Sequence, residues 1–258
     1  MIPHQSKLNN FPPVFVVSVG LSDDRRKYLH EQLEQYGVDN VYYKLFDLWD
    51  QNKYIVTGRN LEDLHIGSYG PVTSHILVNE YWIKNTSYDY VVIMEDDVSF
   101  EFVDLWNFSW EDFFNDLPKD WDLVQLSIMR DNIDDIDVEL RERHNRDLGC
   151  QMYLIKRNYA EELVERYRTK DGFDLSIPET DILYREGDFW ENCNLVPYVE
   201  NIIYESIGKT YSCCLFYEKL EFQTLSQGKT EKEEWRSTCY HRFLGLWKKY
   251  AGNYKKKV

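Results

Sequence analysis

Short apolar runs bounded by turn-forming residues alternate with amphipathic segments along the first part of this chain. Residues 14–19 form a β-branched and aromatic run between two prolines and a glycine, which is typical of a buried strand. Residues 22–36 space their apolar side chains as on one face of a helix, with a serine at the start and a glycine after the end. Residues 41–45 predict a second strand. This order predicts a parallel sheet with helices packed on its faces.

The same periodicities predict further elements as far as the C-terminus. These are a helix beginning at Gly70-Pro71 and ending at residue 84, a strand at 90–94, a helix at 110–116, strands at 121–127 and 149–155, and helices at 159–167 and 231–250. The strongly charged segment 131–147 has no clean period and predicts a surface loop. Beyond Gly172 the signals weaken until the last helix.

A length of 258 residues is near the upper limit for one α/β domain, so we expect a single domain over residues 1–258. The fold class expected is α/β, with a mostly parallel central sheet and helices on both of its faces.

The formal net charge of −15 disfavours nucleic acid as a partner, because a surface of that sign repels phosphate over most of its area. The exception is a basic run at the C-terminus, Lys255-Lys256-Lys257 with Lys248 and Lys249. It predicts either a weak contact with a membrane surface or an acidic partner, or a solvated, frayed terminus.

Neither a transmembrane stretch nor a secretion signal stands out in the sequence, so a cytoplasmic location is expected, and a lumenal one only if a signal has been removed. The five cysteines are scattered and lack a C-x-x-C pair, which indicates free thiols.

The triplet Glu95-Asp96-Asp97 directly follows the apolar run 90–94. Ligand sites of open α/β sheets lie beyond the carboxyl ends of the strands, so these carboxylates occupy a favourable position for chemistry. Adjacent carboxylates repel one another unless a cation offsets their charge, and Mn²⁺ or Mg²⁺ would both bind oxygen ligands and bridge the phosphates of a nucleotide. The alternative is an exposed acidic turn.

Such a site would suit leaving-group catalysis. When a sugar leaves a nucleoside diphosphate, negative charge develops on the bridging oxygen, and a bound divalent cation stabilises it. A second carboxylate can accept the proton of the attacking hydroxyl.

Several blocks of the chain, in their order, resemble glycosyltransferase family 25, which contains lipopolysaccharide and collagen hydroxylysine galactosyltransferases. They are the first strand at 14–19 followed by Asp24-Arg25-Arg26, the block Gly67-Ser68-Tyr69-Gly70-Pro71-Val72-Thr73-Ser74-His75, the strand that ends in Glu95-Asp96-Asp97, and the strand-like runs 121–126 and 149–155. The resemblance spans roughly residues 14–184, about two-thirds of the chain. Ser18 stands where the family usually has asparagine, Pro71 where it usually has cysteine, and the C-terminal third matches poorly.

The resemblance implies a GT-A type fold in which residues 12–130 form the nucleotide-sugar-binding half and residues 131–258 the acceptor-side half with the C-terminal helix. It also implies a UDP-galactose or UDP-glucose donor, Mn²⁺ or Mg²⁺ as cofactor, inversion at the anomeric carbon, and a glycan or protein hydroxyl as acceptor.

Site residues follow from the same blocks. Asp97 would bind the metal, while Glu95 and Asp96 would contact the metal or the ribose of the nucleotide. Arg25 would lie near the nucleotide, or else be a surface helix residue. Ser74 and His75 would line the donor pocket, although a lone helical histidine is commonly structural.

The proton-accepting residue is expected at Asp181, with Glu179 as its rival, although an aspartate there could instead cap a helix. His241 is a candidate for the remaining metal ligand. Two other functions stay open: a catalytically inactive sugar- or nucleotide-binding relative, and a nucleotidyltransferase. The latter normally has a glycine-rich phosphate loop after its first strand, whereas Gly20 is followed by acidic residues here.

Overall fold

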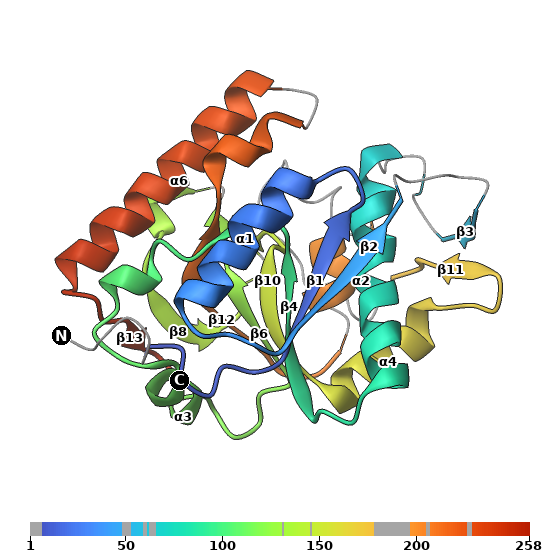
Figure 1. The fold of residues 1–258 in the computed structure, drawn as a ribbon, viewed down its shortest axis with the longest axis horizontal. Coiled ribbons are helices and arrows are strands. Elements are labelled where there is room, and N and C mark those ends of the chain that lie inside the picture. The colour runs from blue at the N-terminus through green and yellow to red at the C-terminus, as the bar shows by residue number, and fades with distance from the viewer. Residues whose placement is uncertain are drawn as a thin grey trace.

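The computed structural model describes residues 7–47, 53–58, 61, 66–130, 132–144, 146–177, 197–204, 207–225 and 229–258 (Figure 1). Its helices are α1 (Asp23–Gln35), α2 (Ile66–Asn85), α3 (Trp110–Asn115), α4 (Arg157–Tyr167), α5 (Val199–Tyr204) and α6 (Lys229–Lys249), with 3₁₀ turns at Val103–Leu105, Ile133–Asp135 and η6 (Leu220–Leu225). Its strands are β1 (Val14–Val19), β2 (Val41–Phe46), β3 (Ile55–Thr57), β4 (Tyr90–Glu95), β5 (Val98–Ser99), β6 (Leu123–Ser127), β7 (Met129–Arg130), β8 (Glu139–Glu142), β9 (Asp147–Leu148), β10 (Met152–Lys156), β11 (Gly172–Asp174), β12 (Thr210–Glu218) and β13 (Lys255–Lys256).

One mixed sheet forms the centre of the molecule, with the strand order β13-β8-β12-β6-β10-β4-β1-β2 and β5 paired to β12. The strands β2, β1, β4, β6 and β12 run in one direction, since β10 is antiparallel to both of its neighbours β4 and β6. The expected α/β class with a mostly parallel central sheet is confirmed, and its strands come from both halves of the chain.

Helices cover both faces of this sheet. Val14 and Val16 of β1 pack into a core with α1 and α6, whereas Phe15 and Val17 pack into a second core with α2, α4 and α5. Both faces of β1 are therefore buried, which explains its continuous apolar run. In Figure 1, α1 crosses in front of the sheet, and α2 and α4 pack beside each other.

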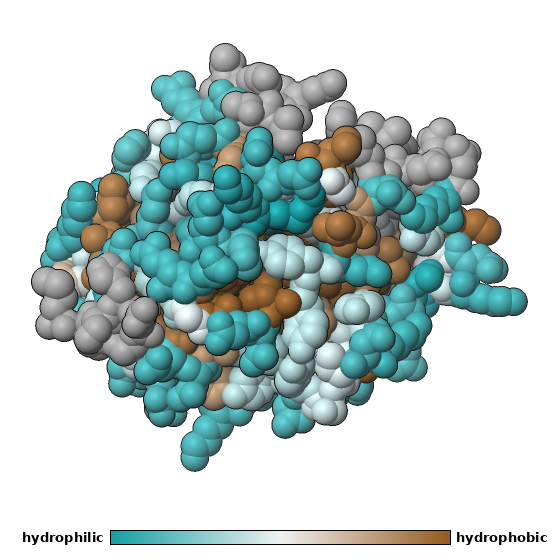
Figure 2. Space-filling model, in the orientation of Figure 1, coloured by the Kyte–Doolittle hydropathy of each residue, from teal (hydrophilic) through white to brown (hydrophobic). Residues whose placement is uncertain are grey.

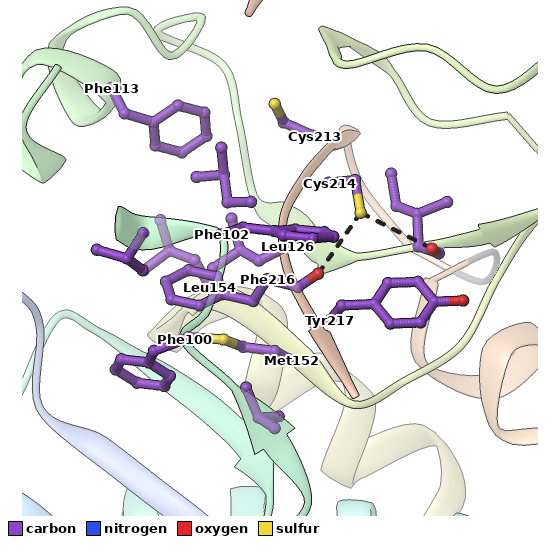
Figure 3. Packing of buried hydrophobic residues seen from close by; sticks show 14 of the residues in the cluster. Phe100, Phe102, Phe113, Leu126, Met152, Leu154, Cys213, Cys214, Phe216 and Tyr217 are labelled. Atoms are coloured by element: carbon purple, nitrogen blue, oxygen red, sulfur yellow. Dashed lines mark hydrogen bonds between the residues drawn. The ribbon is translucent and has the colours of Figure 1, made fainter. Parts of the chain in front are cut away.

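The first core is dense in aromatic side chains. Figure 3 shows Phe100, Phe102 and Phe216 beside Met152 and Leu154, which belong to segments far apart in the sequence. The outer face in Figure 2 is mostly hydrophilic, with apolar side chains in smaller groups. The chain thus encloses its apolar residues between the sheet and its helices.

The helix predicted to begin at Gly70-Pro71 begins one turn earlier, at Ile66, so the predicted start was wrong. Proline lacks one backbone N–H and crowds the preceding turn, but near a helix start few backbone bonds are lost. Burial of Val72, Ile76 and Trp82 against the sheet supports the helix.

The segment 131–147 is not a simple surface loop, because it contains β8 and the first residue of β9. Asp147 is fully buried and accepts hydrogen bonds from Arg130 Nε at 2.8 Å, Arg141 Nη2 at 2.7 Å and Ser212 Oγ at 2.9 Å. The arginines hold the pKa of Asp147 below its ordinary value although burial opposes this. Charged side chains that predicted a surface loop thus pair with opposite charges inside the fold.

The C-terminus is an ordered edge strand and not a frayed tail. Lys255 and Lys257 donate backbone hydrogen bonds to the carbonyls of Val138 and Leu140. The three lysine side chains form ion pairs with Asp137, Asp116 and Glu139, respectively. The positive run is thus matched by carboxylates of its own chain. In the described residues no helix is long and apolar enough to cross a bilayer.

Candidate functional site

The carboxylate triplet lies at the edge of the sheet where the parallel strands β1, β4 and β12 end. After Asp97 the chain returns as β5 and pairs with the end of β12, where Val98 faces Glu218. The Lys219 amide donates to the Asp97 carbonyl at 2.7 Å. The loops after β4 and β12 are therefore fixed next to each other, as expected for the ligand-binding edge of such a sheet.

Asp96 is almost fully buried and is held by two neighbours from the β1–α1 region. Ser18 Oγ donates to Asp96 Oδ2 at 2.6 Å, and Arg26 Nη1 donates to Ser18 Oγ at 2.9 Å. Arg25 Nη1 lies 3.3 Å from Asp96 Oδ1. Burial nevertheless raises the pKa of Asp96 above its ordinary value. Ser18 thus has a direct role in holding this carboxylate.

Arg25 connects the carboxylates to a segment near the C-terminus. Its Nη1 also lies 3.4 Å from Asp97 Oδ2, and its Nη2 donates to the Phe222 carbonyl of η6 at 2.5 Å. The guanidinium lies 5.9 Å from the centre of the Phe222 ring. The structure thus places Arg25 against Asp96 and Asp97, with its side chain 18% exposed.

Glu95 is the more exposed member of the triplet and contacts a buried histidine. His75 Nε2 lies 3.3 Å from Glu95 Oε1. Burial favours a higher pKa for Glu95, but His75, Arg25 and Arg236 together lower it below its ordinary value. Glu95 is therefore ionised at neutral pH.

A cavity of about 320 Å³ opens beside these groups. Of the predicted site residues, Arg25, Ser74, Glu95 and Asp96 line it. The rest of its lining is Val17, Ser18, Val19, Phe46, Asp47, Gly70 and Pro71. His75 has no exposed surface, and its described contacts lie behind Glu95, where it supports the cavity wall. The structure thus places Ser74 in the cavity lining and His75 behind Glu95.

Glu218 is a buried carboxylate that sequence reasoning missed. Gln151 Nε2 donates to its Oε2 at 3.2 Å, and Arg236 Nη1 lies 3.4 Å from the same oxygen. Burial raises the pKa of Glu218 to about 8; Arg236 opposes this, and the nearby charges of Asp97 and Glu95 add to it. The apolar run 213–217 that ends in Glu218 resembles the run 90–94 that ends in Glu95, and this signal could have located it.

The remaining predicted residues are not joined to this cluster. Asp181 and Glu179 lie outside the described residues. His241 is exposed on α6, where its ring packs against that of Tyr240. The structure does not place His241 in a three-ligand group with Glu95 and Asp97, because no three His, Cys, Asp or Glu side chains are arranged for a metal among the described residues.

The donor set still fits a hard divalent cation whose coordination is completed by a substrate. Glu95 and Asp97 carry carboxylate oxygens, which Mg²⁺ and Mn²⁺ prefer. Mg²⁺ in nucleotide sites is commonly bound through one or two carboxylates together with phosphate oxygens. Two carboxylate ligands from the triplet would therefore be enough to bind such a cation when a diphosphate supplies further oxygen ligands.

Neither a protein-family model nor a curated protein matches this chain. Among solved structures, the chain is similar to HddC from Yersinia pseudotuberculosis at 11% identity, with 80% of this chain and 70% of that chain covered and a TM-score of 0.32. It is similar to the inositol-1-phosphate CTP transferase from T. maritima at 11% identity, with coverage of 90% and 78% and a TM-score of 0.34. For the apo-form glycosyltransferase GlyE in Streptococcus pneumoniae TIGR4, the identity is 9%, the coverage 96% and 66%, and the TM-score 0.34. Similarities with TM-scores this low assign no function to the chain.

Proposed function

We propose that this protein is an inverting, metal-dependent glycosyltransferase of the GT-A type that moves galactose or glucose from a UDP-sugar to a hydroxyl of a glycan or protein acceptor. One observation carries the proposal: the triplet Glu95-Asp96-Asp97 stands at the end of a buried parallel strand, and its first two members line a cavity of about 320 Å³ together with Arg25. Sites of that size accept a small ligand.

In this proposal Asp97 and Glu95 would hold a divalent cation, whose Lewis-acid chemistry would stabilise the departing diphosphate. Arg25 is placed to balance negative charge at the same point, since it already contacts Asp96 and Asp97. Ser18 and Arg26 keep Asp96 in position for the nucleotide. The proton of the attacking hydroxyl would pass to Asp181, or to Glu179, in the acceptor-side half.

The first test measures UDP release from UDP-galactose and UDP-glucose with Mn²⁺ present, for the wild type and for Asp97→Ala. We expect the variant to lose roughly a hundredfold or more in rate, because transition-state charge would be left unstabilised. Asp39→Ala, at an exposed aspartate between α1 and β2, is the matched control and should retain the rate.

Equal rates for Asp97→Ala and the wild type would overturn the proposal. Binding of UDP without turnover of any donor would support the inactive sugar- or nucleotide-binding relative. Release of pyrophosphate from a nucleoside triphosphate and a sugar phosphate would support the nucleotidyltransferase.

A further inference from the structure

Behind Glu95 lies a chain of three fully buried polar side chains. His75 and Asn79 belong to successive turns of α2, and Tyr153 belongs to β10. His75 Nδ1 lies 3.1 Å from the Tyr153 hydroxyl, and Asn79 Nδ2 donates to that hydroxyl at 3.1 Å. Together with the contact between His75 and Glu95, this forms an uninterrupted path from the helix interior to the edge of the cavity.

The direction of the hydrogen bonds in this chain is fixed by a backbone carbonyl. Asn79 Nδ2 also donates to the His75 carbonyl at 2.8 Å, and a carbonyl can only accept, so the amide nitrogen of Asn79 must face this way. The Tyr153 hydroxyl therefore accepts from Asn79 and has its own proton left to donate. Burial raises the pKa of the Tyr153 hydroxyl well above its ordinary value, so the hydroxyl keeps that proton.

Among the described contacts of the Tyr153 hydroxyl, the atom that can accept its proton is His75 Nδ1, at 3.1 Å. A neutral imidazole that accepts at Nδ1 carries its hydrogen on Nε2, where the ring faces Glu95 Oε1. Each hydrogen bond thus fixes the direction of the next one. Asn79 donates to Tyr153, Tyr153 donates to His75, and His75 donates to Glu95.

We propose that His75 is a positioning residue, held in its Nε2–H tautomer by Tyr153 and Asn79, which fixes Glu95 at the cavity edge in the orientation that binds the cation and nucleotide. This inference rests on the proposed function, because it assigns Glu95 a ligand-binding task. Glutamate has several rotatable bonds, and a donor anchored in the core restrains them before any ligand arrives. Outer partners of this kind are typically worth 10- to 100-fold in metal affinity.

The tautomer is tested directly by long-range ¹H–¹⁵N NMR of the histidine rings in the ligand-free protein. His75→Gln identifies the signal of His75 by its disappearance. We expect a protonated Nε2 and an unprotonated Nδ1 for His75. In Tyr153→Phe the hydroxyl donor is lost, and the ring signals should move toward exchange between the two tautomers. A wild-type His75 with its hydrogen on Nδ1 would overturn the proposal.

The positioning role is tested by calorimetric titration with Mn²⁺ and UDP. His75→Leu leaves Glu95 without its donor, and we expect binding weakened by about 10- to 100-fold. His75→Gln retains an N–H donor and should recover part of that loss, which a purely structural role would not predict. Tyr153→Phe keeps the imidazole and should weaken binding less than His75→Leu. His30→Gln, at an exposed histidine paired with Glu34 on α1, is the control and should bind as the wild type does.

The outcomes separate the two proposals. Equal Mn²⁺–UDP affinity in the wild type and all His75 and Tyr153 variants that keep the wild-type melting profile would overturn the positioning role while leaving the proposed function intact. A wild-type protein that binds neither Mn²⁺ nor UDP would overturn the proposed function and the positioning role, and the NMR signal would still decide the tautomer.

Discussion

At the scale of single residues, the site is a balance between four carboxylates and two arginines. Asp96 and Glu218 have raised pKa values because burial outweighs their partners, whereas the pKa of Glu95 is lowered by His75 and the arginines. Carboxylates packed at one strand edge therefore differ in their affinity for protons. A divalent cation would favour the ionised forms, so cation binding should release protons from this cluster.

Glu218 predicts a specific pH dependence of stability in the metal-free protein. Its folded-state pKa of about 8 lies above its ordinary value of 4.5, so the folded state binds more protons between these pH values and stability falls as pH rises through them. Glu218→Gln is neutral at every pH and removes this loss. The free energy of unfolding is measured by urea titration in EDTA. We expect the value for the variant to equal that of the wild type near about pH 5 and to be higher by on the order of 4 kcal/mol near about pH 9.

The control for this experiment is Glu31→Gln, at an exposed glutamate of α1. This substitution should change the free energy of unfolding only slightly, and by the same amount at both pH values. A difference between Glu218→Gln and the wild type that does not change with pH would contradict the assigned protonation state of Glu218.

At the scale of elements, the last strand shows how a charged run can be structural. Lys255 and Lys256 form β13, and Lys257 follows it. Their side chains pair with Asp137 before β8, with Asp116 next to α3 and with Glu139 on β8, respectively. Side chains on this edge strand are about half exposed, so their ion pairs are sensitive to salt. Charged edge strands also discourage pairing with other chains.

Replacing Lys255, Lys256 and Lys257 together by glutamine should lower the melting temperature slightly at low ionic strength. The reason is loss of three ion pairs while the backbone bonds of β13 remain. The effect should shrink in about 1 M salt, where the Debye length is about 3 Å. The matched control replaces three exposed lysines, Lys27, Lys119 and Lys248, and makes the same change in net charge. Equal melting temperatures for the two triple variants would show that the ion pairs contribute nothing.

At the scale of the whole molecule, one sheet separates two cores to which both halves of the chain contribute. Four cysteines, Cys150, Cys213, Cys214 and Cys239, are buried in these cores as free thiols. Burial raises the pKa of Cys150, Cys213 and Cys214 above the ordinary value. Burial and the raised thiol pKa values keep these cysteines from reacting with thiol reagents while the cores stay closed.

Labelling with a thiol reagent should therefore report unfolding of the cores. We expect the four buried cysteines to react only as urea approaches the unfolding transition, because thiolate formation and access both require the cores to open. Peptide mapping by mass spectrometry gives the reaction rate of each cysteine, with the fully denatured protein as the reference. Rapid labelling of Cys150 or Cys213 without urea would contradict the packing described.

The sequence by itself determined the local elements of this protein and the position of its acidic triplet. The strands β1 and β4 and the helix α1 can be recognised in the sequence because burial imposes a local period on their apolar side chains. Turn-forming residues mark the ends of these elements. The carboxylates of the triplet could be assigned to the edge where the parallel strands end because they follow a strand buried on both faces.

Only the tertiary structure decided which distant residues meet. It placed Glu218 beside the triplet through the pairing of β5 with β12, paired Arg130 with Asp147 inside the fold, and turned His75 toward Glu95 and Tyr153. These contacts depend on the order of strands in the sheet, which no local pattern encodes. A charged or polar residue looks the same in sequence whether it faces water or a buried partner, so its role follows from the partner that the fold provides.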